Sequence, residues 1–132
     1  MTPDELFENF SYLTEWEDKY KYLIELGDTL PPFPDEDKTE AHKVEGCQSQ
    51  VWFTVQKQGD LYYFNATSDA HIVRGLEAVL LTLVNGKTAQ EIHQMDLSAA
   101  FMRLGLEEHL SPTRRNGFFA MIGRIKNTVL ST

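Results

Sequence analysis

QVWFTVQKQGDLYYFNATSDAHIVRGLEAVLLTLVNG, residues 50–86, gives the strongest indication of the fold, because its hydrophobic pattern changes from the period of a strand to that of a helix. Apolar and polar side chains alternate from Gln50 to Lys57, as in a strand with one buried face. Gln58-Gly59-Asp60 is typical of a turn, and the aromatic-rich stretch Leu61–Ala66 suits an antiparallel partner strand. The first part of this stretch therefore predicts a β-hairpin.

The second part of the same stretch predicts a long buried helix. Ser68 or Asp69 can cap its N-terminus, and Asn85-Gly86 ends it. Apolar residues at helical spacing form a broad stripe between these signals, at Ile72, Val73, Leu76, Val79, Leu80 and Leu83. We expect this helix to be the central and most buried one.

Further helices are predicted on both sides of this unit, with Thr2, Thr14 and Thr88 as caps. They are Pro3–Phe10, a second helix that Gly27 ends, a short helix after Thr88, Ser98–Leu104, and a last helix that Ser111-Pro112 opens. Lys43–Glu45 is a candidate third strand. The order of elements predicts a single α+β domain over residues 1–132, in which a small antiparallel sheet of about three strands packs against helices.

The composition limits the classes of function. Twenty acidic and twelve basic residues give a net charge of −8, which argues against binding to nucleic-acid phosphates. No apolar stretch is long enough to span a membrane, and the N-terminus does not resemble a secretion signal, so we expect a cytoplasmic location. One cysteine and four histidines show no metal-ligand spacing, so no metal site is predicted.

The only cysteine, Cys47, stands between a proline-rich acidic crossing and the first predicted strand. A lone cysteine is most often buried and inert, but the polar neighbours of Cys47 indicate a surface loop. A thiol hydrolase would need a histidine base, and surface or capping roles are expected for all four histidines, His42, His71, His93 and His109. An exposed, weakly activated thiol is better suited to accepting a group that a partner delivers.

The segment VEGCQSQVW, Val44–Trp52, resembles the signature of the SufE family, the sulfur acceptors that work with cysteine desulfurases in iron–sulfur cluster assembly. Other segments are similar to recurring segments of that family, in the same order: Tyr22–Gly27 with Leu30-Pro31, Ser68–Ala70, Ile72–Leu76, and His109–Pro112 through Arg114 to Gly117. The resemblance covers nearly the whole chain. It implies a fold shared with IscU-type scaffold proteins, with the cysteine on a loop at one end of the sheet.

The resemblance also implies a mechanism. Cys47 attacks a sulfane sulfur that the desulfurase holds on its own cysteine, and becomes a persulfide. The pyridoxal phosphate belongs to that partner, a desulfurase of the SufS or CsdA type, so no cofactor is expected on this chain. Sulfur then passes to a downstream acceptor or iron–sulfur scaffold. A single cysteine is too few to hold a cluster on this chain.

The neighbours of the cysteine, Gly46, Gln48, Ser49 and Gln50, are expected to support its loop. The resemblance places Arg114 and Asp69 around this loop or on the partner surface. Arg114 could stabilise a thiolate or persulfide, or be a charge in the first turn of a helix, whereas Asp69 is expected to cap the central helix. Between encounters the loop should fold into a partly apolar niche, for which the candidate lining residues are Trp52, Phe53 and Leu30.

Two other functions stay open. A regulator that binds a desulfurase without carrying sulfur predicts that Cys47→Ser keeps full stimulation of the partner. An independent thiol hydrolase predicts turnover without any partner, and loss of that turnover when one histidine is changed.

Overall fold

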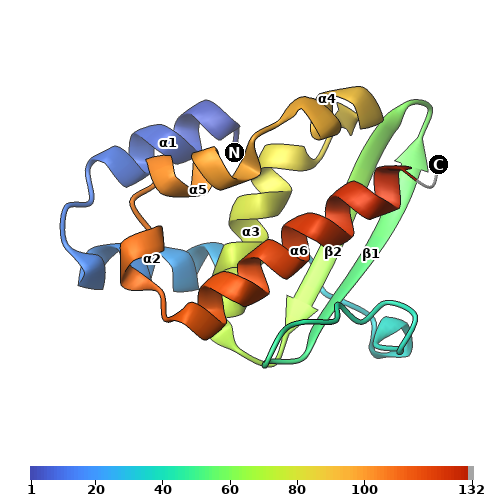
Figure 1. Cartoon of the computed structure of the whole chain (residues 1–132), viewed down its shortest axis with the longest axis horizontal. Coiled ribbons are helices and arrows are strands. Elements are labelled where there is room, and N and C mark those ends of the chain that lie inside the picture. Colours follow the sequence, from blue (N-terminus) through green and yellow to red (C-terminus); the bar gives the residue numbers. More distant parts are fainter. Residues whose placement is uncertain (131–132) are drawn as a thin grey trace.

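The predicted hairpin forms the sheet of the computed structural model, which describes residues 1–130 (Figure 1). β1 (Val51–Gln58) and β2 (Leu61–Ser68) pair antiparallel along their whole length. Gly59, in the turn between them, has a φ of +61°, a left-handed conformation that glycine adopts without strain. The hairpin prediction is confirmed, with small shifts at the strand ends.

The third strand is β3 (Lys87–Thr88), which pairs antiparallel with the start of β2 and gives the sheet order β1-β2-β3. A sheet of three strands is therefore confirmed, but the prediction that Lys43–Glu45 supplies the third strand is wrong. Lys43 makes only an isolated bridge, opposite Trp52. The segment around Lys43 does not form a strand paired with β1, because the chain turns away at Gly46, where φ is +89°.

Helices follow the predicted order around this sheet. The remaining elements are α1 (Pro3–Ser11), α2 (Trp16–Asp28), the 3-10 turn η1 (Asp35–Asp37), α3 (His71–Val84), α4 (Ala89–Gln94), α5 (Leu97–Arg103), the 3-10 turn η2 (Glu107–His109) and α6 (Pro112–Leu130). Within residues 1–130, no helix has the length and apolar character needed to cross a membrane. The α+β class is confirmed.

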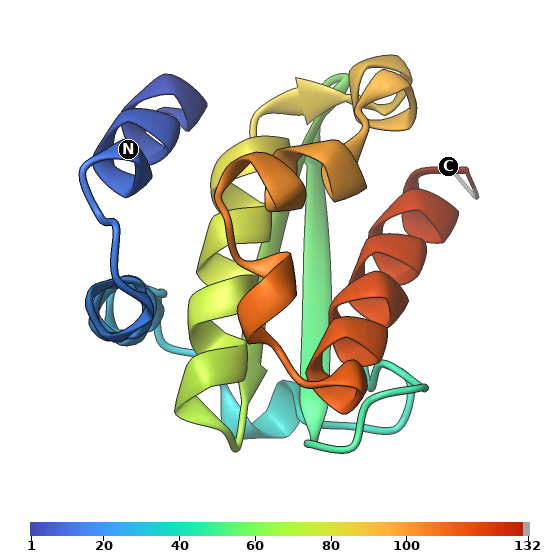
Figure 2. The ribbon, with the colours of Figure 1, turned by 60° about the vertical axis from the view of Figure 1, so that its left-hand side comes forward.

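α3 is the central helix, as its apolar stripe predicts. Figure 2 shows α3 between the α1–α2 pair and the hairpin, and Figure 1 shows α6 running across the hairpin. One core joins these layers, with fully or almost fully buried side chains from each, among them Leu23, Phe53, Leu80, Phe118 and Ile125.

α2 and α3 cross at two glycines, which lets their backbones come very close. A Cβ on Gly27 would lie 2.8 Å from the backbone nitrogen of Gly75, and a Cβ on Gly75 would overlap the backbone of Leu23. The prediction that Gly27 ends the second helix is wrong, because the helix continues to Asp28. Gly27 is required instead by the crossing.

The capping signals at the outer helices are local, and two of them are confirmed. Thr2 and Thr88 form complete capping boxes at the starts of α1 and α4. The predicted cap at Thr14 does not form, since Glu15 occupies the N-cap position of α2 and makes no side-chain cap bond. Ala70 occupies the N-cap position of α3, so the predicted caps at Ser68 and Asp69 are also wrong.

Candidate functional site

The cysteine lies on a tight loop of residues 45–50, here termed the Cys loop, directly before β1. The backbone nitrogen of Val44 donates to the oxygen of Val51 at 2.8 Å, which holds the two ends of the loop side by side. A Cβ on Gly46 would be 3.3 Å from the Cβ of Ala120 in α6 and would sit at a strained φ. Glycine therefore lets the loop turn close against α6.

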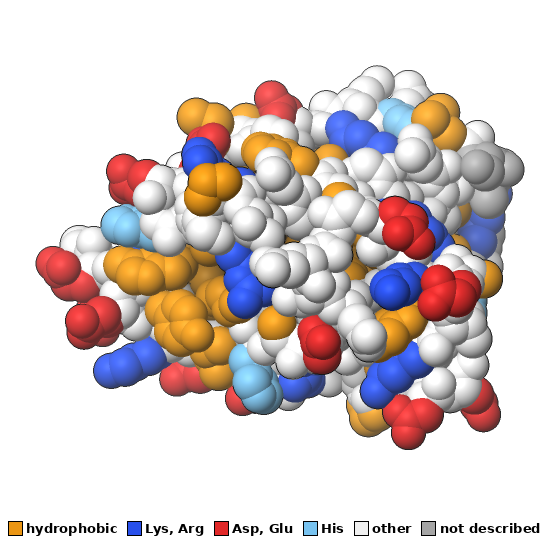
Figure 3. Space-filling model, turned by 60° about the horizontal axis from the view of Figure 1, so that its bottom comes forward, with side chains coloured by type: hydrophobic (Ala, Val, Ile, Leu, Met, Phe, Trp, Pro, Cys, Tyr) orange, Lys and Arg blue, Asp and Glu red, His pale blue; other side chains and the backbone are white. Residues whose placement is uncertain are grey.

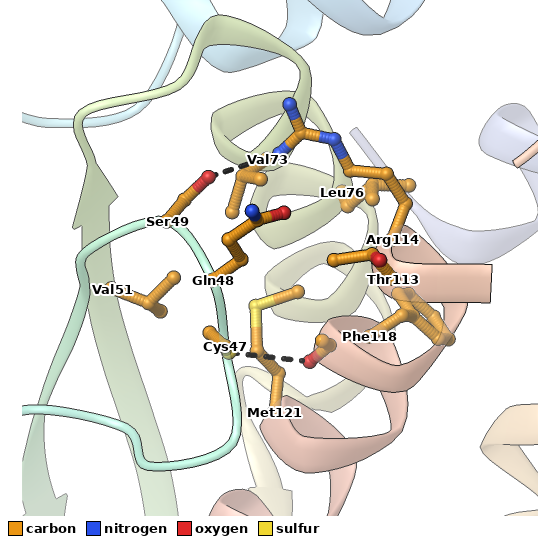
Figure 4. Close-up of a pocket in the computed structure, with 11 residues that line it drawn as sticks. Cys47, Gln48, Ser49, Val51, Val73, Leu76, Thr113, Arg114, Phe118 and Met121 are labelled. Carbon is orange, nitrogen blue, oxygen red and sulfur yellow. Dashed lines mark hydrogen bonds between the residues drawn. The ribbon is translucent and has the colours of Figure 1, made fainter. Parts of the chain in front are cut away.

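The thiol of Cys47 is partly buried and points toward α6 (Figure 4). Its Sγ donates to the backbone oxygen of Gly117 at 3.6 Å. A Cβ on Gly117 would stand 3.7 Å from Sγ, an ordinary van der Waals contact, so this position of α6 lies directly against the thiol. The cavity beside the thiol has a volume of about 20 Å³, room for one water-sized group.

The cavity walls come from β1, α3 and α6, and most of the side chains around the thiol are apolar (Figure 4). The principal lining side chains are Val51, Val73, Leu76, Thr113, Phe118 and Met121. The prediction that Trp52, Phe53 and Leu30 line the niche is wrong. Side chains alternate along β1, so Trp52 faces away when Val51 faces the thiol, and Phe53 lies further along the strand.

Arg114, in the first turn of α6, contacts the Cys loop. Its Nη1 donates to the hydroxyl oxygen of Ser49 at 3.0 Å, and its backbone nitrogen donates to the hydroxyl of Ser111 at 3.2 Å. Arg114 and the exposed Gln48 both line the cavity. The guanidinium therefore joins the start of α6 to the loop that carries the thiol.

Asp69 holds the other end of the loop. Its Oδ1 accepts a hydrogen bond from the backbone nitrogen of Gln50 at 3.1 Å, and its own backbone nitrogen donates to the oxygen of Gln50 at 3.3 Å. The carboxylate of Asp69 is therefore bonded to the Cys loop, which explains why it does not cap α3. Ser68 instead accepts from the backbone nitrogen of Ala70, at 3.2 Å.

In the position that the structure shows, here termed docked, the Cys loop packs over the cavity. The thiol of Cys47 is not activated in this position. Burial raises the pKa of Cys47 above its ordinary value, and the nearby carboxyl of Glu77 raises it further. In the docked loop Cys47 is therefore a neutral thiol rather than the reactive thiolate.

No histidine lines this cavity within the described residues 1–130. The Nδ1 of His42 is 2.7 Å from the backbone oxygen of Asp37, and His109 stacks on Trp16 with ring centroids 5.0 Å apart. The same part of the chain contains no group of three or more His, Cys, Asp or Glu side chains placed to hold a metal ion. Neither a histidine base nor a metal site accompanies the thiol here.

The surface at the lower side of the molecule is mixed rather than uniformly acidic. Figure 3 shows hydrophobic side chains gathered on its left, with acidic, basic and histidine side chains around them. Aromatic side chains on and beside α2 add exposed apolar area to the molecule, among them the Trp16–His109 stack and the ring of Tyr20. The face in Figure 3 thus exposes both apolar and charged groups.

Three features of the site were not predicted from the sequence. Gly117 and the α3 wall face the thiol only because α3 and α6 pack together, and no local pattern signals that. Glu77 did carry a signal, since it is a single acidic residue inside the apolar stretch of residues 72–84. Its burial shows that it belongs to the core and not to a solvated face.

A solved structure has the same fold. The solution structure of a hypothetical protein from Thermus thermophilus matches over 100% of both chains with a TM-score of 0.77, at 22% identity. Because the match extends over the full length, it includes the sheet and the helices that carry the cavity walls.

The sequence is also similar to the sequences of known proteins. An uncharacterized SufE-like protein of Rhizobium meliloti is 48% identical over 128 residues, covering 94% of this chain and 91% of the relative. The sulfur acceptor protein CsdE of Escherichia coli is 46% identical over 123 residues, covering 92% of this chain and 83% of the relative. The family model described as "SufE: Fe-S metabolism associated domain" matches residues 4–129, nearly the whole sequence, and this chain therefore belongs to the SufE family.

Proposed function

We propose that this chain is a sulfur acceptor for a cysteine desulfurase, and that it carries the sulfur as a persulfide on Cys47. The observation that carries the proposal is the docked thiol, which lies on a short loop over an apolar cavity and has no histidine base among the residues that line it. The relative from Escherichia coli, 46% identical, is named a sulfur acceptor protein.

The loop is suited to a thiol that must leave its own fold to react. Its side-chain attachments to the rest of the molecule include the Arg114–Ser49 and Asp69–Gln50 hydrogen bonds and the weak bond from Sγ to Gly117. These bonds lie near the surface and can be exchanged for bonds to water or to a partner. Breaking them would let Cys47 extend into another protein's pocket.

The transfer step resembles thiol–disulfide exchange. The Cys47 thiolate attacks the outer sulfur of a persulfide on the partner's cysteine. A new S–S bond forms on Cys47, the S–S bond of the partner breaks, and the partner's cysteine leaves as a thiolate that takes up a proton. The pyridoxal phosphate that generates the sulfane sulfur belongs to the partner and is not required on this chain.

The cavity supports the carrier role. With a volume of about 20 Å³ beside Sγ, it has room for roughly one further atom the size of sulfur. The apolar walls would shield a persulfide from reductants and oxidants until a recipient removes its outer sulfur. The recipient would be a further sulfur acceptor or an iron–sulfur scaffold, because one cysteine cannot hold a cluster itself.

The test is intact-mass spectrometry under non-reducing conditions, after incubation with a pyridoxal-phosphate cysteine desulfurase and L-cysteine. We expect the wild type to gain about 32 Da, one sulfur atom, that dithiothreitol removes, and Cys47→Ser to gain nothing. Ser11→Ala, which keeps the thiol and changes an exposed serine at the end of α1, serves as the matched control and should still gain sulfur.

The two alternatives give different results in the same experiment. If Cys47→Ser stimulates the desulfurase as fully as the wild type and neither protein gains mass, the chain is a regulator that carries no sulfur. Turnover of a thioester without a desulfurase would instead indicate a hydrolase. The raised pKa of Cys47 and the lack of a histidine among the described residues of its cavity argue against that outcome.

A further inference from the structure

A second arginine of α6 bonds to the segment that leads into the Cys loop. Arg124 donates from Nη1 to the backbone oxygen of Lys43 at 3.0 Å, and from Nη2 to the backbone oxygen of Ala41 at 2.7 Å. Both acceptors belong to residues 41–44, here termed the arm, which directly precede the loop. The sulfur-transfer step uses neither Arg124 nor the arm.

The arm lies along the edge of β1 that β2 does not use. The backbone nitrogen of Val44 donates to the oxygen of Val51 at 2.8 Å. One step further along β1, the backbone nitrogen of Phe53 donates to the oxygen of His42 at 2.9 Å. Lys43 stands between these two bonds, so its own oxygen points away from β1. The guanidinium of α6 supplies the donor that a further strand would otherwise give to this edge.

The same face of α6 contacts both the arm and the thiol. Gly117 and Met121 precede Arg124 by seven and three positions, so the three residues share one side of the helix. Gly117 accepts from the thiol of Cys47, and Met121 lines the cavity. One helix therefore supports the arm at one point and the docked thiol at another.

The two arginines on this helix hold the segment differently. Arg114 makes one bond, to the side chain of Ser49, in the part of the segment that must move when Cys47 leaves the cavity. Arg124 makes two bonds, both to backbone oxygens of the arm, and two bonds from one guanidinium also fix geometry. The arm is paired with β1 on its other side. It is thus held on two sides, by α6 and by β1.

We propose that Arg124 is a positioning residue, which fixes the arm so that only residues 45–50 move when Cys47 reaches toward a partner. The arm is then the fixed base of the opening loop. Its part in the free protein requires no partner, whereas its effect on sulfur transfer rests on the proposed function.

A fixed arm limits where the open loop can place the thiol. Without Arg124 the arm can leave the edge of β1, and the thiol then samples more positions. A smaller fraction of those positions suits the pocket of a desulfurase, so the apparent KM for this chain rises in proportion. A small reagent needs no particular position, and it reacts faster with a thiol that is less restrained. Loss of Arg124 therefore slows one reaction and speeds the other.

The first test is amide hydrogen exchange in the free protein, comparing the wild type with Arg124→Gln. The Val44 amide reports on the arm, and the Gln50 amide reports on the loop. In the wild type we expect Val44 to be protected at least about tenfold better than Gln50, because the loop opens without the arm. In Arg124→Gln the protection factor of Val44 should fall by about tenfold or more, since two bonds from a charged group are lost.

An internal reference and a matched control separate this effect from a loss of global stability. Protection of Val44 is expressed relative to the Gly86 amide, which donates to Tyr62 at the opposite end of β2. Arg115→Gln removes a positive charge from the same helix, but the Arg115 side chain lines a different hollow, with Met102 and Glu108. This control should behave as the wild type in every measurement.

The second test compares the two reactions of Cys47. Sulfur gain is followed by mass spectrometry at increasing concentrations of this chain, with a desulfurase and L-cysteine, and alkylation is followed with iodoacetamide alone. We expect Arg124→Gln to raise the KM for this chain severalfold with little change in kcat, and to speed alkylation by a few fold. Arg124→Lys, which keeps one charged donor, should recover part of both effects.

The outcomes distinguish this proposal from the proposed function. An unchanged ratio of Val44 to Gly86 protection in Arg124→Gln would overturn the anchoring role. A ratio that falls while the KM stays at the wild-type value would overturn the positioning of the thiol. If the exchange results hold but the wild type itself gains no sulfur, sulfur acceptance fails and the anchoring of the arm by Arg124 stands.

Discussion

The Asp69 carboxylate accepts the Gln50 amide, so its removal should release one end of the Cys loop. We expect Asp69→Ala to raise the rate of Cys47 alkylation by iodoacetamide by a few fold, up to about tenfold, since a hydrogen bond to a charged group is lost. Asp60→Ala, in the hairpin turn, removes an exposed carboxylate far from the loop and should leave the rate unchanged. An unchanged rate in Asp69→Ala would mean that the bond does not hold the loop.

A second prediction at a single contact concerns the bond between Arg114 and Ser49. Arg114→Gln and Ser49→Ala each break it, and each should raise the alkylation rate of Cys47. If the bond is the cause, the double variant reacts no faster than the faster single variant, because both changes remove the same interaction. Rates that multiply in the double variant would show that the two residues act on the loop separately.

Single-residue roles were predicted only where they depend on local sequence. Cys47 was correctly placed on a loop, because its glycine and polar neighbours exclude a core segment. Asp69 was expected to cap α3, but its carboxylate bonds to Gln50, nineteen positions earlier. A choice between a local cap and a distant amide depends on tertiary packing, which one sequence does not specify.

Between the helices, the α2–α3 crossing should tolerate no side chain at Gly75. A Cβ there would overlap the backbone of Leu23, which cannot move without shifting α2. We expect Gly75→Ala to lower the free energy of unfolding by about 3 kcal/mol or more, measured by urea denaturation. Gly123→Ala is the matched control, because no described atom lies within 4 Å of its added Cβ in α6. It should raise stability by up to about 1 kcal/mol through helix propensity.

The helices and strands were predicted well where one segment contains the whole signal. The hairpin, the apolar stripe of α3 and the capping boxes at Thr2 and Thr88 are of this kind. The third strand was assigned to the wrong segment, because β3 has only two residues and shows no alternating pattern. Gly27 was interpreted as a helix stop because its true partner, Gly75, lies in another helix.

Over the full chain, the cavity exists only because distant segments meet. Cys47 and its acceptor Gly117 are 70 positions apart, and α3 supplies the wall between β1 and α6. In the sequence, Val73, Leu76 and Phe118 each have the pattern of ordinary core residues. The resemblance to the SufE family pointed to the thiol, but the lining of its niche required the packed structure.

The contribution of Glu77 to global stability should fall as pH rises. Its pKa is 4.5 in an ordinary setting and about 9 in the fold, so between these values the unfolded chain has lost a proton that the folded chain keeps. The contribution of Glu77 to the free energy of unfolding therefore decreases with pH, by up to about 1.4 kcal/mol per unit. Glu77→Leu removes this contribution and keeps a similar volume. Urea denaturation at pH 6, 7 and 8 should show the free energy of unfolding of the variant rising relative to that of the wild type by up to about 3 kcal/mol over that range.

The difference between the two proteins cancels the titration of all other groups, including the carboxylates and histidines. A difference that stays constant with pH would mean that Glu77 is already charged in the fold.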